Sequence, residues 1–169
     1  MDNGFFAMIS RMKYIDRWAL MRNEHRENLT EHSFEVAVIA HALAEIGRKR
    51  FGKQLNGEKA ALLGLFHDAA ETLTGDMPTP VKYYNEEVRN AYKTVEQKAA
   101  ESLISMLPED FREDYAPLLI ADESDGELHI LVKAADKISA LIKCLEEKKA
   151  GSSEFNSAYT GTLESIKAL

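Results

Sequence analysis

Two adjacent ionisable residues, His67 and Asp68, follow an apolar run at 60–66 that has the composition of a buried helix. A charged pair beside such a run costs several kcal/mol unless partners or a metal ion compensate it. Glu71 follows about one helical turn later, so the spacing predicts that all three side chains occupy neighbouring parts of one helix face. An imidazole and carboxylates grouped in this way could bind a divalent metal.

Two more residues interrupt the apolar pattern of other predicted helices. Asp136 lies beside the apolar positions of 128–142, and His32 lies in the first turns of a helix whose later residues are apolar. Each has an ordinary explanation, because a histidine is commonly hydrogen-bonded and a nearby lysine could pair with the aspartate. Together with His67 and Asp68, however, they offer two imidazoles and two carboxylates from three helices. This set suits a divalent transition metal with room for an acidified water and a phosphate oxygen.

Helical periodicity dominates the elements that must position these residues. Strand-like alternation is nowhere sustained, and Pro78 and Pro80 interrupt the pattern after Gly75. An all-α bundle of about six to seven helices with no significant sheet is therefore predicted. Residues 13–27, which include Arg17 and Trp18, have no period and are interpreted as an ordered loop. The predicted helices cover 5–12, 28–47, 56–74, 88–106, 108–119, 128–150 and, more weakly, 155–169.

The composition places the chain among ordinary globular proteins. Its 169 residues, 45% apolar and 29% charged, predict a single domain over residues 1–169. The net charge of −7 disfavours binding to a nucleic-acid polymer. No apolar run approaches the roughly 20 residues that cross a bilayer, so no membrane association is expected. One cysteine, Cys144, and a first segment without a basic patch favour a cytoplasmic protein.

The order and intervals of His32, His67-Asp68 and Asp136 resemble the HD-domain phosphohydrolase superfamily. Longer segments are similar to those of the bacterial HD-domain 5′-deoxynucleotidases, and the similarity extends over about residues 5–155. His-Asp alone is weak evidence, whereas the Arg-Trp loop together with Gly-Asp-Met-Pro-Thr-Pro-Val-Lys is specific. The segments that carry the resemblance are 15–23, 31–33, 67–71, 74–82 and 143–147.

This resemblance implies a metal-dependent phosphohydrolase. Such an enzyme removes the 5′-phosphate from 2′-deoxyribonucleoside 5′-monophosphates by attack of a metal-activated water, with little choice among bases. It also implies one divalent transition metal per site, of the cobalt, manganese or copper class, and a homodimer. Chains of the family usually continue with more helical sequence, so the C-terminus at Leu169 is expected to be shortened relative to them.

The resemblance also implies a role for each matching residue. Glu71 would be catalytic and would orient or deprotonate the attacking water. Substrate would be bound, and deoxyribose selected, by Arg17, Trp18 and Asp76. The metal ligands would be His32, His67, Asp68 and Asp136.

Elementary chemistry supports these roles. A flat Trp18 wall against C2′ would reject a ribose hydroxyl by steric conflict and by leaving it unpaired, which costs ~1–3 kcal/mol. Asp76, in a loop rich in Pro and Gly, can accept a hydrogen bond from a sugar hydroxyl. An alternative for Trp18 is that it only anchors its loop to the core.

Two other functions are compatible with the sequence. An HD-domain hydrolase could act on another phosphorylated nucleotide, such as a triphosphate, a cyclic nucleotide or an alarmone. The chain could also be a non-catalytic helical interaction module, although the complete ligand set and Glu71 argue against a decayed site.

Overall fold

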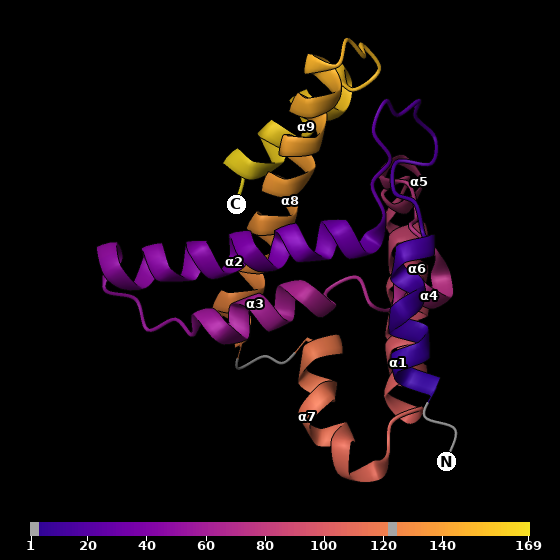
Figure 1. The fold of residues 1–169 in the computed structure, drawn as a ribbon, viewed down its shortest axis with the longest axis vertical. Helices are drawn as coiled ribbons and strands as arrows, with labels where there is room; N and C mark the ends of the chain where they lie inside the picture. Colours follow the sequence, from indigo (N-terminus) through magenta and orange to yellow (C-terminus); the bar gives the residue numbers. More distant parts are fainter. Residues whose placement is uncertain (1–3, 122–124) are drawn as a thin grey trace.

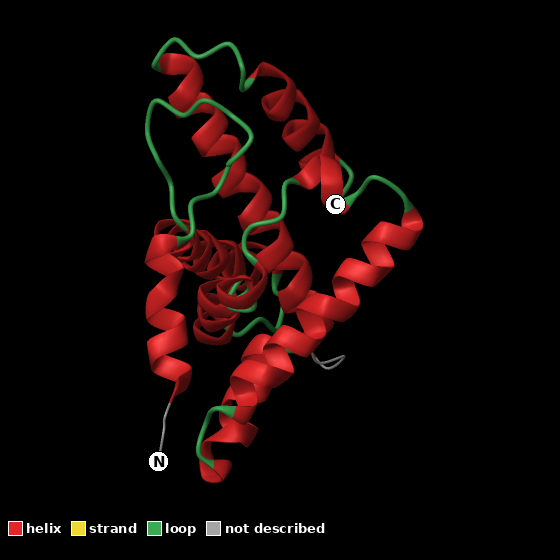
Figure 2. Cartoon of the chain, turned by 90° about the vertical axis from the view of Figure 1, so that its right-hand side faces the viewer, coloured by secondary structure: helices red, strands yellow, loops and turns green. Residues whose placement is uncertain are grey.

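The computed structural model describes residues 4–121 and 125–169 (Figure 1). Within these ranges the chain forms helices and loops (Figure 2). The only pairing of strand type in the described residues is an isolated bridge between Asp16 and Asn28. The predicted all-α class is therefore confirmed. The helices are α1 (Gly4–Ile9), the 3-10 helix η1 (Ser10–Tyr14), α2 (Leu29–Phe51), α3 (Gly57–Phe66), α4 (Glu71–Thr74), α5 (Thr79–Lys82), α6 (Glu86–Ser105), α7 (Glu109–Leu119), α8 (Gly126–Lys149) and α9 (Asn156–Lys167).

The described helices outnumber the six to seven that periodicity predicted. The excess consists of short elements, since α4 and α5 have four residues each and lie in the segment that glycine and proline interrupt. One turn of helix is too short to give a periodic signal. None of the described helices combines the length and the apolar character that crossing a membrane requires.

The main hydrophobic core lies where α2, α3 and α8 pack together (Figure 1). From α2 it takes Val36, Ala40 and Ala44, which are fully buried at intervals of one turn. The backbones of α2 and α3 nearly touch, because a Cβ added at Gly64 would lie 2.9 Å from the Ala37 Cα atom. This close approach brings the first turns of α2 next to the end of α3. A second apolar cluster joins α1 to α6.

Capping confirms one predicted helix start and corrects one predicted end. The Asn28 side chain accepts hydrogen bonds from the backbone N–H groups of Thr30 and Glu31, and the Glu31 side chain accepts one from the Asn28 N–H. This reciprocal pattern is a capping box. The helix does not stop near Gly47, however, and continues to a left-handed Gly52 with φ 66°. Basic residues in its last turn favour this extension, because they interact with the helix dipole.

The expectation that His67, Asp68 and Glu71 share one helix face is wrong. Helix α3 ends at Phe66, and a turn at 67–70 separates it from α4. His67 Nδ1 lies 2.7 Å from the Gly64 carbonyl, which is the acceptor that a continuing helix would offer to the backbone of residue 68. The side chain of His67 therefore competes with the helix that precedes it.

The loop at 15–28 is closed at its base and fastened to α8. Its base is held by backbone hydrogen bonds from Arg17 N–H to the Glu27 carbonyl (2.9 Å) and from Leu29 N–H to the Ile15 carbonyl (3.0 Å). These bonds confirm that the loop is ordered.

Helix α8 holds the tip of this loop through a buried ion pair. The fully buried carboxylate of Glu147 accepts the backbone N–H groups of Glu24 and His25 at 2.9 and 3.0 Å. Lys143 donates to the same carboxylate and to the His25 carbonyl. Burial alone would raise the pKa of Glu147, but these donors outweigh it and lower the pKa to about 2.

We expect this ion pair to stabilise the fold in a pH-dependent way. A carboxylate with a lowered folded-state pKa contributes its full stabilisation above its ordinary pKa of 4.5, and this is lost as the pH falls towards about 2. Glu147→Gln should therefore lower the melting temperature most at pH 7, and the difference from the unmodified protein should shrink below about pH 4.5. Glu146→Gln, at the exposed neighbouring position, is the matched control. A difference that stays constant from pH 7 to pH 3 would contradict this prediction.

Candidate active site

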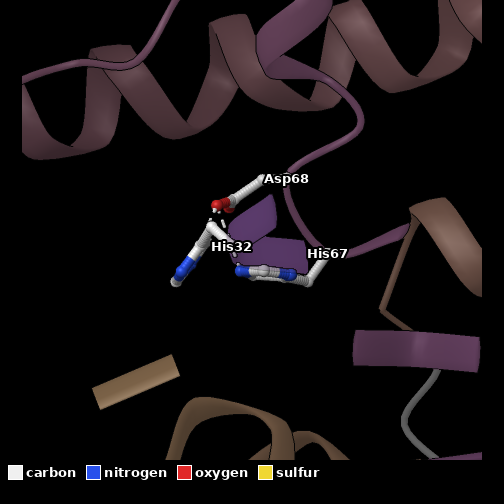
Figure 3. A group of neighbouring side chains, drawn as sticks. All are labelled: His32, His67 and Asp68. Carbon is white, nitrogen blue, oxygen red and sulfur yellow. Dashed lines mark ion pairs between the residues drawn. The ribbon is translucent and has the colours of Figure 1, made fainter. Parts of the chain in front are cut away.

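Three of the four predicted metal ligands converge on one point. His32 comes from the first turn of α2, and His67 and Asp68 come from the turn after α3 (Figure 3). The Asp68 Oδ2 atom lies 3.1 Å from His67 Nε2 and 3.6 Å from His32 Nε2. One ligand atom from each of the three residues lies within 4.8 Å of the other two, which is close enough to share a metal ion.

Asp136 joins this group from α8. Its Oδ1 atom lies 3.3 Å from His32 Nε2, on the edge of the compact group of three rather than within it. Burial alone would raise the pKa of Asp136, but the adjacent His32 ring together with Lys137 and His67 outweighs it and lowers the pKa. Asp136 is thus an anionic group that faces the same imidazole as Asp68.

Hydrogen bonds orient both imidazoles in the same way. Ser139 Oγ lies 3.1 Å from His32 Nδ1 and donates its single hydrogen to Glu35 Oε2 at 3.0 Å, so it accepts from His32 Nδ1–H. His67 Nδ1–H donates to the Gly64 carbonyl. In both rings the network therefore places a hydrogen on Nδ1, so that Nε2 carries the lone pair in the neutral ring.

The two Nε2 atoms are the test of whether this group fits a metal. Both are buried and have no hydrogen-bond partner among the described residues. Lone pairs of nitrogen that face carboxylate oxygens repel them unless a positive charge lies between. Two imidazole nitrogens with carboxylate oxygens also form the donor set that divalent transition metals prefer. The group therefore fits a divalent cation.

A cavity of about 610 Å³ opens beside this group. Its volume falls within the range of small-molecule sites in proteins. The N-terminal loop, the segment at 76–83, α8 and α9 all contribute to its walls. Among the residues predicted to act on substrate or metal, those that line it are Arg17, Trp18, Asp68, Glu71, Asp76 and Asp136.

Arg17 links the loop at 15–28 to the group of His32, His67 and Asp68. Its Nε atom donates to Glu27 Oε2 at 3.0 Å, and its Nη1 atom lies 3.5 Å from Asp68 Oδ2. Only 11% of its side chain is exposed, and it lines the cavity. Arg17 can therefore offer N–H donors to an anion while it stays paired with two carboxylates.

Trp18 both packs against the core and lines the cavity. Its ring packs against the buried Phe155, with centroids 5.3 Å apart, and its Nε1–H donates to Glu27 Oε2 at 2.9 Å. It also lines the cavity. Its φ of 60° is in the left-handed region, which is unusual for a bulky residue. The surrounding contacts thus hold this side chain in a set position at the wall of the cavity.

Glu71 and Asp76 are two acidic groups in the same cavity. Glu71 is buried, and its Oε2 atom has no hydrogen-bond partner within the described ranges. Burial raises the pKa of Glu71 to about 9, and the nearby Asp68 and Asp76 carboxylates add to this shift. Burial also raises the pKa of Asp76, against the opposing charge of Arg17. Glu71 consequently holds its proton at neutral pH unless additional positive charge nearby lowers its pKa.

The sequence did not single out several residues that hold the site in place. Lys82 lines the cavity and pairs with Glu96 at 2.7 Å. The sequence of α8 did contain a signal for buried polar residues, because the apolar stripe of Leu128, Val132 and Ala135 continues at one-turn intervals towards the end of the helix. The buried residues that continue it are the polar Ser139, Lys143 and Glu147.

Comparisons with known proteins identify the family of this chain. The model of the family described as 5′-deoxynucleotidase YfbR-like matches residues 4–169. A 5′-deoxynucleotidase of Vibrio parahaemolyticus is 54% identical over 154 residues, covering 91% of this chain and 79% of the relative. The 5′-deoxynucleotidase YfbR of Salmonella paratyphi B is 51% identical over 94% of this chain and 80% of its own.

A solved structure extends the comparison to the fold. An HD-domain phosphohydrolase of Listeria innocua superimposes with a TM-score of 0.86 at 27% identity, covering 97% of this chain and 79% of its own. The resemblance inferred from the His-Asp pair and the Arg-Trp loop is therefore confirmed. This chain belongs to the YfbR-like 5′-deoxynucleotidase family.

Proposed function

We propose that this protein is a divalent-metal-dependent 5′-deoxynucleotidase, which hydrolyses a 2′-deoxyribonucleoside 5′-monophosphate to the deoxynucleoside and phosphate. The observation that carries the proposal is the group of His32, His67 and Asp68, which could share one ion beside a cavity large enough for a nucleotide. Membership of the 5′-deoxynucleotidase family supports the choice of substrate.

The metal would be held by His32, His67, Asp68 and Asp136. The lone pairs on the two Nε2 atoms and the adjacent carboxylates support this assignment. When bound, a divalent cation would draw in the phosphate and lower the pKa of a nearby water. An ion of the cobalt, manganese or copper class is the finer proposal, since imidazole nitrogen favours such metals over magnesium or calcium.

Arg17 and Lys82 would offset the negative charge of the protein towards an anionic substrate. Both line the cavity, and both are paired with carboxylates that hold them in place. Because phosphoryl transfer depends mainly on positioning and charge stabilisation, fixed cations of this kind are what the reaction requires.

Glu71 would act on the proton of the attacking water. Its carboxyl faces the cavity, is shielded from solvent and has an unpartnered oxygen in the described structure. In the unprotonated form it accepts the proton as the water attacks phosphorus, and it can then return that proton to the leaving 5′-oxygen.

Trp18 and Asp76 would select the sugar. The Trp18 ring is held against Phe155 and forms part of the cavity wall, so it can exclude a 2′-hydroxyl. Asp76 lies in the same wall and can accept a hydrogen bond from a sugar hydroxyl. We also propose that the enzyme works in the cytoplasm, where the buried free thiol of Cys144 would remain reduced.

A homodimer is the proposed assembly. Phe34 and Val38, one turn apart on α2, are 64% and 54% exposed, and Leu62 and Leu65 of the neighbouring α3 are also exposed. Apolar surface of this kind is often covered by another subunit. Sedimentation of the protein should give the mass of two chains, and a single-chain mass at micromolar concentration would contradict this assembly.

Phosphate release tests the function directly. The protein supplied with cobalt or manganese should release phosphate from dAMP much faster than from AMP, and a chelator should abolish the release. Deoxyadenosine triphosphate is the comparison substrate. Equal rates on dAMP and AMP, no activity with any divalent metal, or tripolyphosphate released from the triphosphate would each overturn the proposal.

The role of Glu71 makes a separate prediction. Glu71→Gln should lower kcat on dAMP by about 100-fold or more, because it removes the proton acceptor. The affinity for the metal alone, measured by calorimetric titration, should stay nearly unchanged, since Glu71 is not among the proposed ligands. Glu87→Gln, on the exposed surface of α6, is the control. If turnover survives in Glu71→Gln, the residue only shapes the site.

A further inference from the structure

We propose that Glu27 is the positioning residue that sets sugar discrimination, because it fixes Arg17 and Trp18 together. This inference rests on the proposed function, in which Trp18 excludes the 2′-hydroxyl. Glu27 does not line the cavity and would not touch the substrate. It would act only through the two residues that do.

One carboxylate oxygen of Glu27 carries both contacts. Its Oε2 atom accepts the Trp18 Nε1–H at 2.9 Å and the Arg17 Nε–H at 3.0 Å. Glu27 is only 9% exposed, so little water competes for that oxygen. A hydrogen bond to a buried charged acceptor is stronger and more directional than one between neutral groups. The indole and the guanidinium are therefore set relative to each other by a shared atom.

The backbone of Glu27 restrains the same two residues. The Arg17 N–H donates to the Glu27 carbonyl at 2.9 Å, next to the bridge between Asp16 and Asn28. Trp18 then follows with its positive φ, a conformation that a residue with a Cβ atom adopts only when its surroundings impose it. Glu27 thus holds one residue by its backbone and both by its side chain.

Three other anchors of this loop act elsewhere. Glu147 and Lys143 bind the tip at residues 24 and 25, and Glu154 accepts the Arg22 N–H at 2.9 Å. None of these contacts reaches the side chains of Arg17 or Trp18. Phe155 and Asp68 contact the Trp18 ring and the Arg17 guanidinium respectively, but among the described contacts Glu27 is the one that joins both side chains.

Replacement of Glu27 tests the proposal through the ratio of kcat/KM on dAMP to kcat/KM on AMP. Glu27→Leu keeps the volume but removes the shared acceptor, and it should lower the ratio about tenfold, as expected for the loss of a charged hydrogen bond. Glu27→Gln retains an acceptor oxygen and should lower the ratio by only about threefold. Glu154→Leu, which cuts a different anchor of the same loop, should leave it unchanged.

Fluorescence provides a readout that does not depend on activity. Trp18 is the only tryptophan in the chain, so the emission of the protein reports on that ring alone. Glu27→Leu should shift the emission to longer wavelength and increase quenching by acrylamide, because the ring is no longer held by Glu27. Glu154→Leu should give the emission of the unmodified protein. If Glu27→Leu does not fold, Glu27→Gln must still show both effects at reduced size.

Trp18→Ala separates failure of this inference from failure of the proposed function. If Trp18→Ala leaves the dAMP to AMP ratio unchanged, the proposed sugar selection by Trp18 is wrong. If Trp18→Ala lowers the ratio but the Glu27 variants do not, or if their emission is unchanged, Glu27 does not position the ring. A Glu27→Leu substitution added to Trp18→Ala should lower the ratio little further, since both act on one contact.

Discussion

The central physical constraint in this protein is the repulsion among the groups that converge beside the cavity. Two imidazole nitrogens point their lone pairs towards the carboxylates of Asp68 and Asp136, because Ser139 and the Gly64 carbonyl take the hydrogens on the opposite side of each ring. Such a group is stable only with positive charge at its centre. The surrounding structure assembles these donors and keeps them from relaxing apart.

The close approach of α2 and α3 makes this assembly possible. At Gly64 the two backbones come nearer than any side chain would allow, which brings His32 to the residues that follow α3. Helix α3 then ends at Phe66, and the His67 side chain donates a hydrogen bond to the Gly64 carbonyl. The third partner, α8, adds Asp136 at the same level. The packing of these three helices therefore also determines where the proposed metal ligands meet.

Local signals in the sequence predicted much of this structure. The helix starts predicted at 28 and 56 are correct, with the Asn28 and Asn56 side chains as caps, and the His-Asp pair contributed to identifying the family. The end of α3 was not predictable, because it depends on where a ring nitrogen finds its acceptor. Glu27 was missed because its importance comes from partners nine and ten residues away in a loop without periodicity. The single-domain assignment and the site roles stay predictions.

The polar continuation of the α8 stripe has a mechanical consequence. Near the middle of α8, Ser139 forms a hydrogen bond with the His32 ring, and Lys143 and Glu147 bind the loop at 15–28 one and two turns later. Because a helix is stiff over two turns, a tilt of α8 that displaced Ser139 would also displace Lys143 and Glu147. Substitutions that change the volume of side chains packed against α8 would therefore affect the proposed metal site and the loop that carries Arg17 and Trp18 at the same time.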